Sequence, residues 1–164
     1  MTRPLYVSTF STAAGPFSVA IDAAGAVVAT AFGDIATLRT RCGPTADLQE
    51  DADRTEPARV QIISYLAGQR HAFDLPLAAR GSSFQRRVWT ALRGIPRGET
   101  RSYGRLARDL GSSARAVGRA NATNPICLIV PCHRVIGSDG ALTGFAFGEP
   151  IKRRLLELEG VSGV

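Results

Sequence analysis

The chain has 164 residues, of which 45% are hydrophobic and 21% are charged, and its formal net charge is +6. This length allows one ordinary domain or two small ones with a real core, and the composition excludes a disordered protein. No apolar stretch approaches the roughly 18 residues of a membrane span, and the N-terminus lacks a signal-peptide pattern, so we expect a cytoplasmic protein that does not enter a membrane.

Cysteine and histidine are scarce, with Cys42, Cys127, Cys132, His71 and His133 as the full set. They are too few for a disulfide framework and lack the paired spacing of a structural zinc site. We therefore expect no metal. Cys127 is interpreted as a small core residue and Cys42 as incidental.

Positive charge is concentrated in the second half. Residues 1–80 hold seven Arg and eight Asp or Glu, whereas residues 81–164 hold thirteen Lys or Arg and six Asp or Glu. Nine arginines lie between Arg86 and Arg119. Such asymmetry is typical of a protein that binds a polyanion. An arginine-rich surface from a GC-biased genome would look the same, so composition alone leaves both readings open.

The first half begins with signals for strands. Leu5–Phe10 is apolar and β-branched, Gly15-Pro16 predicts a turn, and Phe17, Val19 and Ile21 alternate. A third strand is expected over Val27–Phe32. These segments predict a small sheet.

One helix is expected after the strands. Residues 36–54 are polar and irregular, and Pro57 suits the first turn of a helix that ends at Gly68. Its predicted apolar face consists of Val60, Ile63 and Ala67. Residues 69–81, rich in Pro, Ala and Gly, are interpreted as a linker.

The second half opens with a well-signalled helix. Ser82 and Gln85 have the spacing of a capping box. Apolar residues follow at helical spacing, and Gly94–Gly98 ends the helix. Its predicted inner face consists of Phe84, Val88, Trp89 and Leu92. Trp89 is accordingly assigned to the core and not to base stacking.

Two short helices with a glycine turn between them come next. Ser102 caps the first, which carries Leu106 and Leu110; Gly111 makes the turn; and Ser112 or Ser113 caps the second, which runs to about Ala122. This order is typical of a helix-turn-helix.

The second of these helices has Arg115 and Arg119 among alanine and glycine. It offers little to read base edges, but it could approach a narrow groove closely and insert Arg115. The sequence therefore favours docking in the minor groove without sequence specificity. A small-residue helix packed inside the protein remains the alternative.

A reactive cysteine is expected after the apolar run Ile126–Val130, which predicts a buried strand. Pro131 cannot extend a strand ladder, so the chain should turn there. Cys132 would then lie at the end of a rigid element beside His133, an imidazole that can accept the thiol proton.

The last helix is expected to open near Pro150, with an inward stripe of Ile151, Leu155 and Leu158. Glu159 extends this stripe, and a carboxylate there needs a partner. His133 is the natural candidate, since a carboxylate would fix its tautomer. A frayed, exposed Glu159 fits the periodicity as well. Glu157 is expected to pair with Arg153 on the solvent side.

These residues carry a family resemblance. The sequence resembles the O6-alkylguanine-DNA alkyltransferase (methylated-DNA–protein-cysteine methyltransferase) family, densely over residues 80–160 and only in general plan before that. The matching segments are Pro131–Val135, Asn124-Pro125, Ala114–Gly118, Phe84–Trp89, Ile95–Thr100, Ser102–Gly104, Gly140–Gly144 and Leu155–Glu159.

The resemblance implies an α+β fold in two domains. Residues 1–80 would form a small ribonuclease-H-like scaffold of sheet plus helix. Residues 81–164 would form a helical domain of the winged helix-turn-helix type that carries the active site.

It also implies roles for individual residues. Cys132 would accept the alkyl group, His133 would deprotonate it through a water, and Glu159 would hold His133. Asn124 would brace the active-site turn. Tyr103 would donate to guanine N3 and would rotate a phosphate during nucleotide flipping.

The DNA-binding set would lie on and before the second short helix, with Arg115 filling the gap left by the flipped nucleotide. Its members are Ser102, Ala114, Arg115, Ala116, Gly118 and Arg119. The substrate pocket would be formed by Tyr103, Val135, Phe145 and Ala146, and the carbonyls of Cys132 and Val135 would read the guanine amino group.

The implied partner is double-stranded DNA that contains O6-alkylguanine, with O4-alkylthymine as a second substrate. A base stacked in a duplex hides its alkyl carbon, so the nucleotide must leave the stack. Transfer to Cys132 yields a stable thioether, so each chain would act once. The family needs no cofactor. We expect a monomer and leave cooperative binding to DNA open.

Two positions depart from the family pattern, since Phe145 and Ala146 stand where many relatives carry tyrosine and serine or glycine. The NH of Ala146 could still donate to O6, while the range of alkyl groups is left open.

Three other classes of protein fit the sequence less well. A non-catalytic alkylguanine binder would lack Cys132, a helix-turn-helix regulator would need base-reading side chains, and a cysteine hydrolase would not need the basic half.

Overall fold

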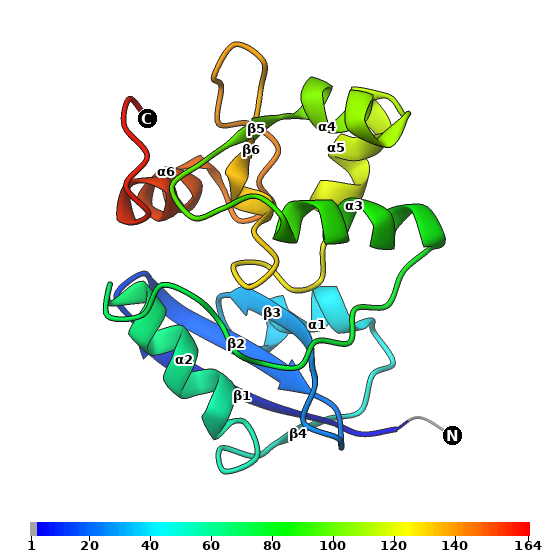
Figure 1. Cartoon of the computed structure of the whole chain (residues 1–164). Helices are drawn as coiled ribbons and strands as arrows, with labels where there is room; N and C mark the ends of the chain where they lie inside the picture. The colour runs from blue at the N-terminus through cyan, green and yellow to red at the C-terminus, as the bar shows by residue number, and fades with distance from the viewer. Residues whose placement is uncertain (1–2) are drawn as a thin grey trace. The chain divides into compact units, whose positions relative to one another are not determined.

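The computed structural model describes residues 3–164, which fold into two compact units (Figure 1). One unit ends at Arg80, and the other comprises Gly81–Val164. The expected mixture of a small sheet and several helices is confirmed. Within the described range, no helix combines the length and the apolarity needed to cross a bilayer.

The N-terminal unit is built on a four-stranded sheet with the order β3-β2-β1-β4. The strands are β1 (Leu5–Thr12), β2 (Gly15–Ile21), β3 (Val27–Phe32) and β4 (Leu48–Glu50). The first three are antiparallel neighbours, as predicted, and β4 pairs with β1 in parallel. In Figure 1, helix α2 (Glu56–Leu66) runs in front of this sheet and α1 (Ile35–Cys42) behind it.

The turn predicted at Gly15-Pro16 is wrong by two residues. The β1–β2 turn consists of Ala13 and Ala14, because the Thr12 hydroxyl donates to the Gly15 carbonyl and accepts from the Ala14 NH. Gly15 and Pro16 already belong to β2, where Pro16 lies opposite Ser11.

The segment 36–54 is not irregular, because it contains most of α1 and all of β4. Asp34 caps α1 by accepting from the Thr37 NH. Leu38 is the one residue of this helix that is buried, and β4 has only three residues, so neither element leaves a periodic apolar signal.

Helix α2 was predicted correctly as a helix, but the prediction of its buried face was wrong. Its buried residues are Ala58, Ile62, Tyr65 and Leu66. Val60, which was predicted to face inward, is 53% exposed. The buried face includes Tyr65 and Leu66, which present more apolar surface than Val60 and Ala67 of the predicted face, and their burial sets the orientation of the helix.

The predicted linker 69–81 is partly a structured segment of the N-terminal unit. Phe73 stacks on Tyr65 with ring centroids 4.7 Å apart. The Val27 NH donates to the Pro76 carbonyl, and the Ala78 NH donates back to Val27. Backbone pairing with a strand therefore extends almost to the boundary of the unit.

The C-terminal unit contains four helices and a two-stranded parallel sheet. The helices are α3 (Ser83–Arg93), α4 (Tyr103–Leu110), α5 (Ala114–Ala122) and α6 (Glu149–Leu158), and the strands are β5 (Arg101–Ser102) and β6 (Val135–Ile136). The capping box of Ser82 and Gln85 is present. Trp89 is buried and donates through Nε1 to the Ala120 carbonyl at 2.7 Å, which confirms its place in the core.

The α4–α5 pair has the predicted caps. Ser102 caps α4, Gly111 adopts the left-handed conformation with φ 63°, and Ser113 caps α5. Helix α5 is not enclosed, because Val117, Ala120 and Asn121 are buried while its other face is exposed. The alternative of a helix packed inside the protein is therefore excluded.

The apolar run Ile126–Val130 is buried but is not a strand. It forms a turn in which the Val130 NH donates to the Ile126 carbonyl. Leu128 has φ 72°, a left-handed conformation that costs a branched residue energy and ends any strand. Burial was correctly predicted from this run, including that of Cys127, and its conformation was not.

Helix α6 begins at Glu149, next to the predicted Pro150. Its most buried residues are Lys152, Leu155 and Leu156, whereas the predicted stripe included Ile151 and Leu158. Arg153 pairs with Glu149 at 3.0 Å and not with Glu157, since an acid four residues before a base on a helix pairs better than one four residues after it.

Candidate functional site

Cys132 opens a one-turn 3₁₀ helix, Cys132–Arg134, and is 5% exposed. The turn before it is fastened at both ends by Asn124. The side-chain amide of Asn124 donates to the Val130 carbonyl at 2.9 Å, and its oxygen accepts from the Ile126 NH at 3.0 Å. Asn124 thus makes the contacts expected of a brace, and the backbone that carries Cys132 is rigidly held.

The predicted contact between His133 and Glu159 is present. His133 Nε2 lies 2.9 and 3.0 Å from the two oxygens of Glu159, and both side chains are fully buried. Glu159 is therefore not the frayed, exposed residue of the alternative reading. A carboxylate only accepts, so the neutral imidazole carries its hydrogen on Nε2 and leaves the lone pair on Nδ1.

Arg134 is a second partner of the same carboxylate. Its Nε donates to Glu159 Oε1 at 2.9 Å and its Nη2 to Oε2 at 3.0 Å, and Nη1 donates to the Ile95 carbonyl at 2.7 Å. This bidentate pairing fixes the orientation of Glu159. The sequence reasoning gave Arg134 no role, although it stands inside the motif Pro131–Val135.

Burial lowers the pKa of His133, and the contact with Glu159 only partly opposes this effect. The imidazole is therefore neutral near pH 7 and able to accept a proton. Its Nδ1 is buried and has no hydrogen-bond partner in the structure as described. The site thus presents an unoccupied basic nitrogen next to Cys132 in the chain.

Tyr103 lies at the start of α4 and donates its hydroxyl to the Thr143 carbonyl at 3.0 Å. The Asn121 side-chain amide lies 3.5 Å from the same hydroxyl. Desolvation raises the pKa of Tyr103, so the phenol keeps its proton at neutral pH and remains a donor.

Asn121 connects Tyr103 with the cysteine loop and was not singled out from the sequence. Its amide also donates to the Cys132 carbonyl at 3.2 Å, and its side-chain oxygen is buried without a hydrogen-bond partner in the described chain. The Cys132 carbonyl additionally accepts from the Val135 NH. Asn121 gave a weak signal, as the one amide on the buried face of α5.

Lys152 is a third residue that sequence reasoning missed. Its side chain is fully buried on α6, and its ammonium donates to the carbonyls of Val135 and Thr143. Desolvation lowers the pKa of Lys152 to about 8, against smaller opposing effects of Cys132 and Glu149. A signal existed, because Lys152 precedes the buried Leu155 and Leu156 by three and four residues.

The remaining pocket residues flank this group. Val135 and Phe145 are buried, and the Phe145 ring meets Phe147 edge-on with centroids 5.7 Å apart. Ala146 is exposed. Tyr103, Lys152 and the loop through Thr143 and Phe145 are thus close together through the Thr143 carbonyl.

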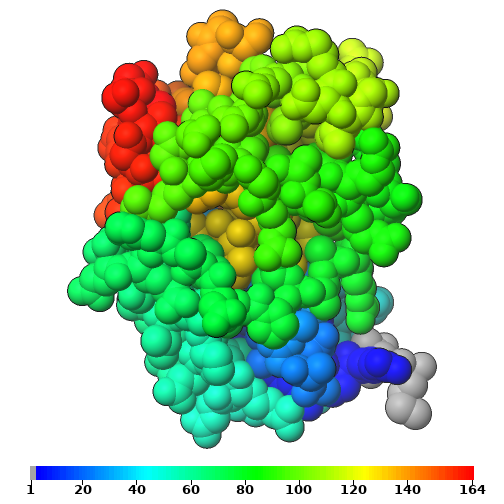
Figure 2. All heavy atoms as spheres, viewed as in Figure 1, coloured from blue at the N-terminus to red at the C-terminus, as the bar shows by residue number. Residues whose placement is uncertain are grey.

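The predicted DNA-binding residues lie on the exposed side of the unit. Ala114, Arg115 and Arg119 are exposed, while Ala116, Gly118 and Ser102 are half-buried. The α4–α5 segment (yellow-green) lies at the surface in Figure 2. Arg115 and Arg119 form no ion pair with any residue in the described range, so both charges face solvent.

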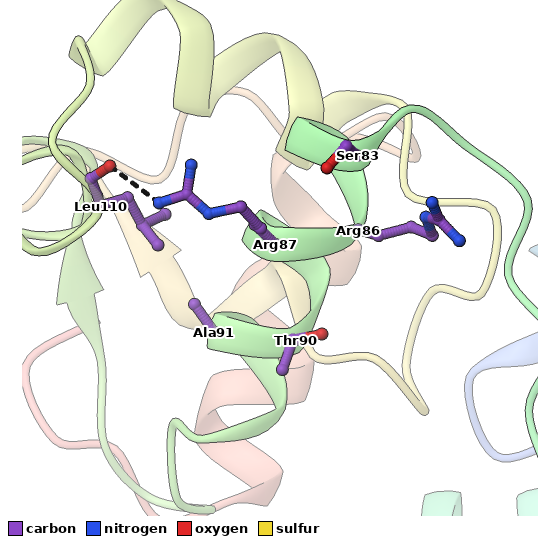
Figure 3. A pocket seen from close by; sticks show the side chains of 6 residues that line it. All are labelled: Ser83, Arg86, Arg87, Thr90, Ala91 and Leu110. Carbon is purple, nitrogen blue, oxygen red and sulfur yellow. Dashed lines mark hydrogen bonds between the residues drawn. The ribbon is translucent and has the colours of Figure 1, made fainter.

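A shallow hollow of about 560 Å³ lies elsewhere on the unit, along the outer side of α3 (Figure 3). Its lining is Ser83, Arg86, Arg87, Thr90, Ala91 and Leu110. Arg87 points to the end of α4 and donates to the Leu110 carbonyl, while Arg86 points away from it. None of the predicted site residues lines this hollow.

No group of three or more His, Cys, Asp or Glu residues with metal-binding geometry occurs in the part of the chain that the structure describes. The chemistry available at the site is that of a thiol, a neutral imidazole held by a carboxylate, a phenol and a buried ammonium. This set suits transfer of a group to sulfur.

Comparison with known proteins decides the family. Residues 83–161 match the family described as 6-O-methylguanine DNA methyltransferase, DNA binding domain. A methylated-DNA–protein-cysteine methyltransferase of Methanosarcina acetivorans is 51% identical over 113 residues, which cover 68% of this chain and 72% of that protein. The chain belongs to the methylated-DNA–protein-cysteine methyltransferase family.

Further relatives agree with this assignment. A protein of the same name from Mycolicibacterium paratuberculosis is 56% identical over 101 residues, which cover 60% of this chain and 61% of the relative. Among solved structures, Mycobacterium tuberculosis OGT in complex with DNA has a TM-score of 0.83 and 41% identity, and the match covers 94% of this chain and 92% of that one. The predicted enzyme class, a DNA-repair methyltransferase, is thereby confirmed.

A more distant structure also matches over nearly the whole chain. The O6-methylguanine-DNA methyltransferase from Pyrococcus kodakaraensis strain KOD1 has a TM-score of 0.65 and 28% identity, covering 96% of this chain and 99% of that one. The N-terminal half, which has few recognisable motifs, therefore shares the fold of this family too.

Proposed function

We propose that this methyltransferase repairs DNA by moving the alkyl group of O6-alkylguanine in a duplex onto the sulfur of Cys132. The observation that carries this proposal is the buried pair of His133 and Glu159 beside Cys132, with His133 Nδ1 unoccupied. A thiol reacts as its thiolate, and an imidazole with a free lone pair provides the base.

The proposed step begins with proton transfer from the Cys132 thiol to His133 Nδ1 through one bridging water. Glu159 stabilises the imidazolium, and Arg134 keeps Glu159 in place. The thiolate then attacks the alkyl carbon from roughly 3–3.5 Å. A C–S bond forms, the C–O6 bond breaks, and its electron pair remains on the guanine.

Donors around the purine assist its departure as a leaving group. The Tyr103 hydroxyl donates to guanine N3, and the Ala146 NH donates to O6. The guanine amino group is read chiefly by the Val135 carbonyl, since the Cys132 carbonyl already accepts from Asn121 and from the Val135 NH. Recognition by both carbonyls, as the resemblance implied, would require Asn121 to move.

Access to the base requires that the nucleotide leave the stack, which takes a few kcal/mol. Exposed arginines on α5 fit this task, because phosphate contacts supply binding free energy and Arg115 can fill the gap in the stack. The small side chains Ala114, Ala116 and Gly118 allow close approach to a minor groove. Ser102 and Arg119 would contact the backbone.

The finer description of fold and partner belongs to the same proposal. We interpret the N-terminal unit as ribonuclease-H-like and the C-terminal unit as a winged helix-turn-helix in which α4, Gly111 and α5 form the motif. The protein would act as a monomer on double-stranded DNA. O4-alkylthymine is proposed as a second substrate, since its alkyl group is bonded to an exocyclic oxygen of the base in the same way.

The test is intact-mass and peptide analysis after incubation with a duplex that contains O6-methylguanine. We expect one methyl group on Cys132 and never more than one repair event per chain. Cys132→Ser should abolish transfer but keep DNA affinity, whereas Cys42→Ser should behave as wild type. Repeated turnover would indicate a hydrolase, and an unmodified Cys132 in a folded protein that binds the duplex would refute the proposal.

A further inference from the structure

Lys152 is the one lysine of the chain, and its side chain is completely buried. It forms no ion pair with any carboxylate of residues 3–164. An unpaired ammonium is costly to remove from water, and its neighbours on this face of α6 are Leu155 and Leu156. An apolar residue would pack there without the free-energy cost of desolvating a charge. Packing alone therefore does not explain a lysine at this position.

The partners of Lys152 are two main-chain carbonyls, those of Val135 in β6 and of Thr143 in the loop before α6. The lysine thus ties this loop to the strand that follows the cysteine. The Thr143 carbonyl also accepts from the Tyr103 hydroxyl at 3.0 Å. One carbonyl therefore has two side-chain donors, and the ammonium lies 5.9 Å from the centre of the Tyr103 ring.

The loop lies directly against the Tyr103 hydroxyl. Gly144 has φ +82°, and a Cβ there would stand 2.5 Å from the phenolic oxygen. Only a residue without a side chain can take this place. Tyr103 is hence fully engaged with the loop in this structure, and its hydroxyl must leave Thr143 before it can donate to a base.

This relationship assigns a task to the lysine, given the function proposed above. We propose that Lys152 is a positioning residue for alkyl transfer, which holds the Thr143 carbonyl and its loop in place when the Tyr103 hydroxyl turns to the substrate. The carbonyl stays hydrogen-bonded throughout the exchange, and Phe145 and Ala146 remain at the pocket wall. Without Lys152, the departure of Tyr103 would leave Thr143 with no side-chain donor.

A purely electrostatic role is the competing explanation, because the ammonium also interacts with Cys132 and could stabilise its thiolate. The two roles predict different behaviour toward a small reagent. Iodoacetamide reacts with the thiolate but needs neither the pocket wall nor Tyr103. Followed at Cys132 by peptide mass analysis, which separates it from the half-exposed Cys42, its rate reports the state of the Cys132 thiol.

The experiment compares Lys152→Met with Arg154→Met, which removes an exposed cation from the same helix. For Lys152→Met we expect alkyl transfer from the duplex to slow by about tenfold or more, with DNA affinity and iodoacetamide reactivity within about twofold of wild type. Arg154→Met should stay within about twofold in all three measurements. An equal loss toward iodoacetamide, or no loss toward the duplex, overturns the proposal.

Coupling to Tyr103 provides the second readout. In a Tyr103→Phe background there is no hydroxyl to exchange, so adding Lys152→Met should slow transfer by no more than about threefold. The same loss in both backgrounds would mean that the two residues act independently and would reject the proposal. If Lys152→Met does not fold, Lys152→Arg takes its place in the same cycle, and its loss of transfer rate should likewise be smaller in the Tyr103→Phe background than in the wild-type background.

Hydrogen exchange distinguishes a failure of this proposal from a failure of the proposed function. Amides of residues 142–148 should exchange faster in Lys152→Met than in wild type without any DNA, since the tie to Val135 is lost. Unchanged exchange overturns the positioning role whether or not the protein transfers alkyl groups. A wild-type protein that forms no adduct rejects the function through the mass measurement alone.

Discussion

Arg134 and Glu159 form a doubly hydrogen-bonded ion pair, with Nε–Oε1 and Nη2–Oε2 distances of 2.9 and 3.0 Å, inside the C-terminal unit. The same carboxylate accepts from His133. One buried negative charge therefore serves two neighbours in sequence, one cationic and one neutral. The ion pair holds Glu159, and Glu159 in turn holds the imidazole.

Replacing Glu159 with Gln should damage both stability and activity. The amide is nearly isosteric, but it leaves the Arg134 charge buried without a counter-ion, so we expect a loss of about 3 kcal/mol in the free energy of unfolding. Transfer should also slow, because the imidazolium loses its stabilising charge. Denaturant unfolding and single-turnover kinetics measure the two effects.

Glu157→Gln is the matched control, since this exposed residue lies two positions away on α6. It should change neither quantity measurably. If Glu159→Gln unfolds at the wild-type denaturant concentration, the ion pair contributes little to stability and the structural argument is wrong.

The well-predicted parts of the fold are those with local signals. The caps at Ser82, Ser102 and Ser113, and the strand alternation before residue 33, depend on neighbours in sequence, and the structure has them. The burial of the run Ile126–Val130 was predicted correctly, but its conformation was misread. Asn124 closes it into a turn, and hydrophobicity alone cannot distinguish a buried turn from a buried strand.

The site shows the same division. The contact between His133 and Glu159 could be inferred, because a carboxylate on an apolar stripe demands a partner and few candidates existed. Arg134, Asn121 and Lys152 could not be assigned this way, since their partners are main-chain carbonyls or a carboxylate already allotted to His133. Carbonyl acceptors are present at every residue and leave no sequence signature.

Acid should destabilise the protein through His133. Burial holds the pKa of His133 below its usual 6.5, so the unfolded chain takes up a proton first as the pH falls. The contribution of His133 to stability is fully present above about pH 6.5. Below that pH it declines by at most about 1.4 kcal/mol per pH unit. When the free energy of unfolding is measured between about pH 7.5 and about pH 5, it should fall less steeply for His133→Asn than for wild type. Parallel curves for the two proteins would exclude this assignment.

Alkali should have the opposite effect through Lys152. The pKa of Lys152 is about 8 in the folded protein against 10.5 for the free side chain, so between these values the unfolded chain binds more protons. Stability should therefore rise with pH across this window, by up to about 3 kcal/mol from this group. Lys152→Met should lack this rise relative to wild type in denaturant titrations. Identical pH profiles would mean that the ammonium is not buried in solution.

Arg115 should matter for the duplex and not for the chemistry. It is exposed on α5 and unpaired within the described residues, so Arg115→Ala should fold normally. We expect transfer from duplex O6-methylguanine to slow by about tenfold, because the gap in the base stack is no longer filled. Reaction with the free base O6-benzylguanine should be unchanged, since no stack has to be opened.

Arg93→Ala removes an exposed arginine of α3 and controls for charge alone. Each substitution should reduce the salt dependence of DNA binding by at most about one unit of slope, if the residue touches phosphate. Equal effects of the two substitutions on transfer would mean that Arg115 contributes only its positive charge. An equal loss of rate with the free base would mean that Arg115 acts in the substrate pocket and not in the base stack.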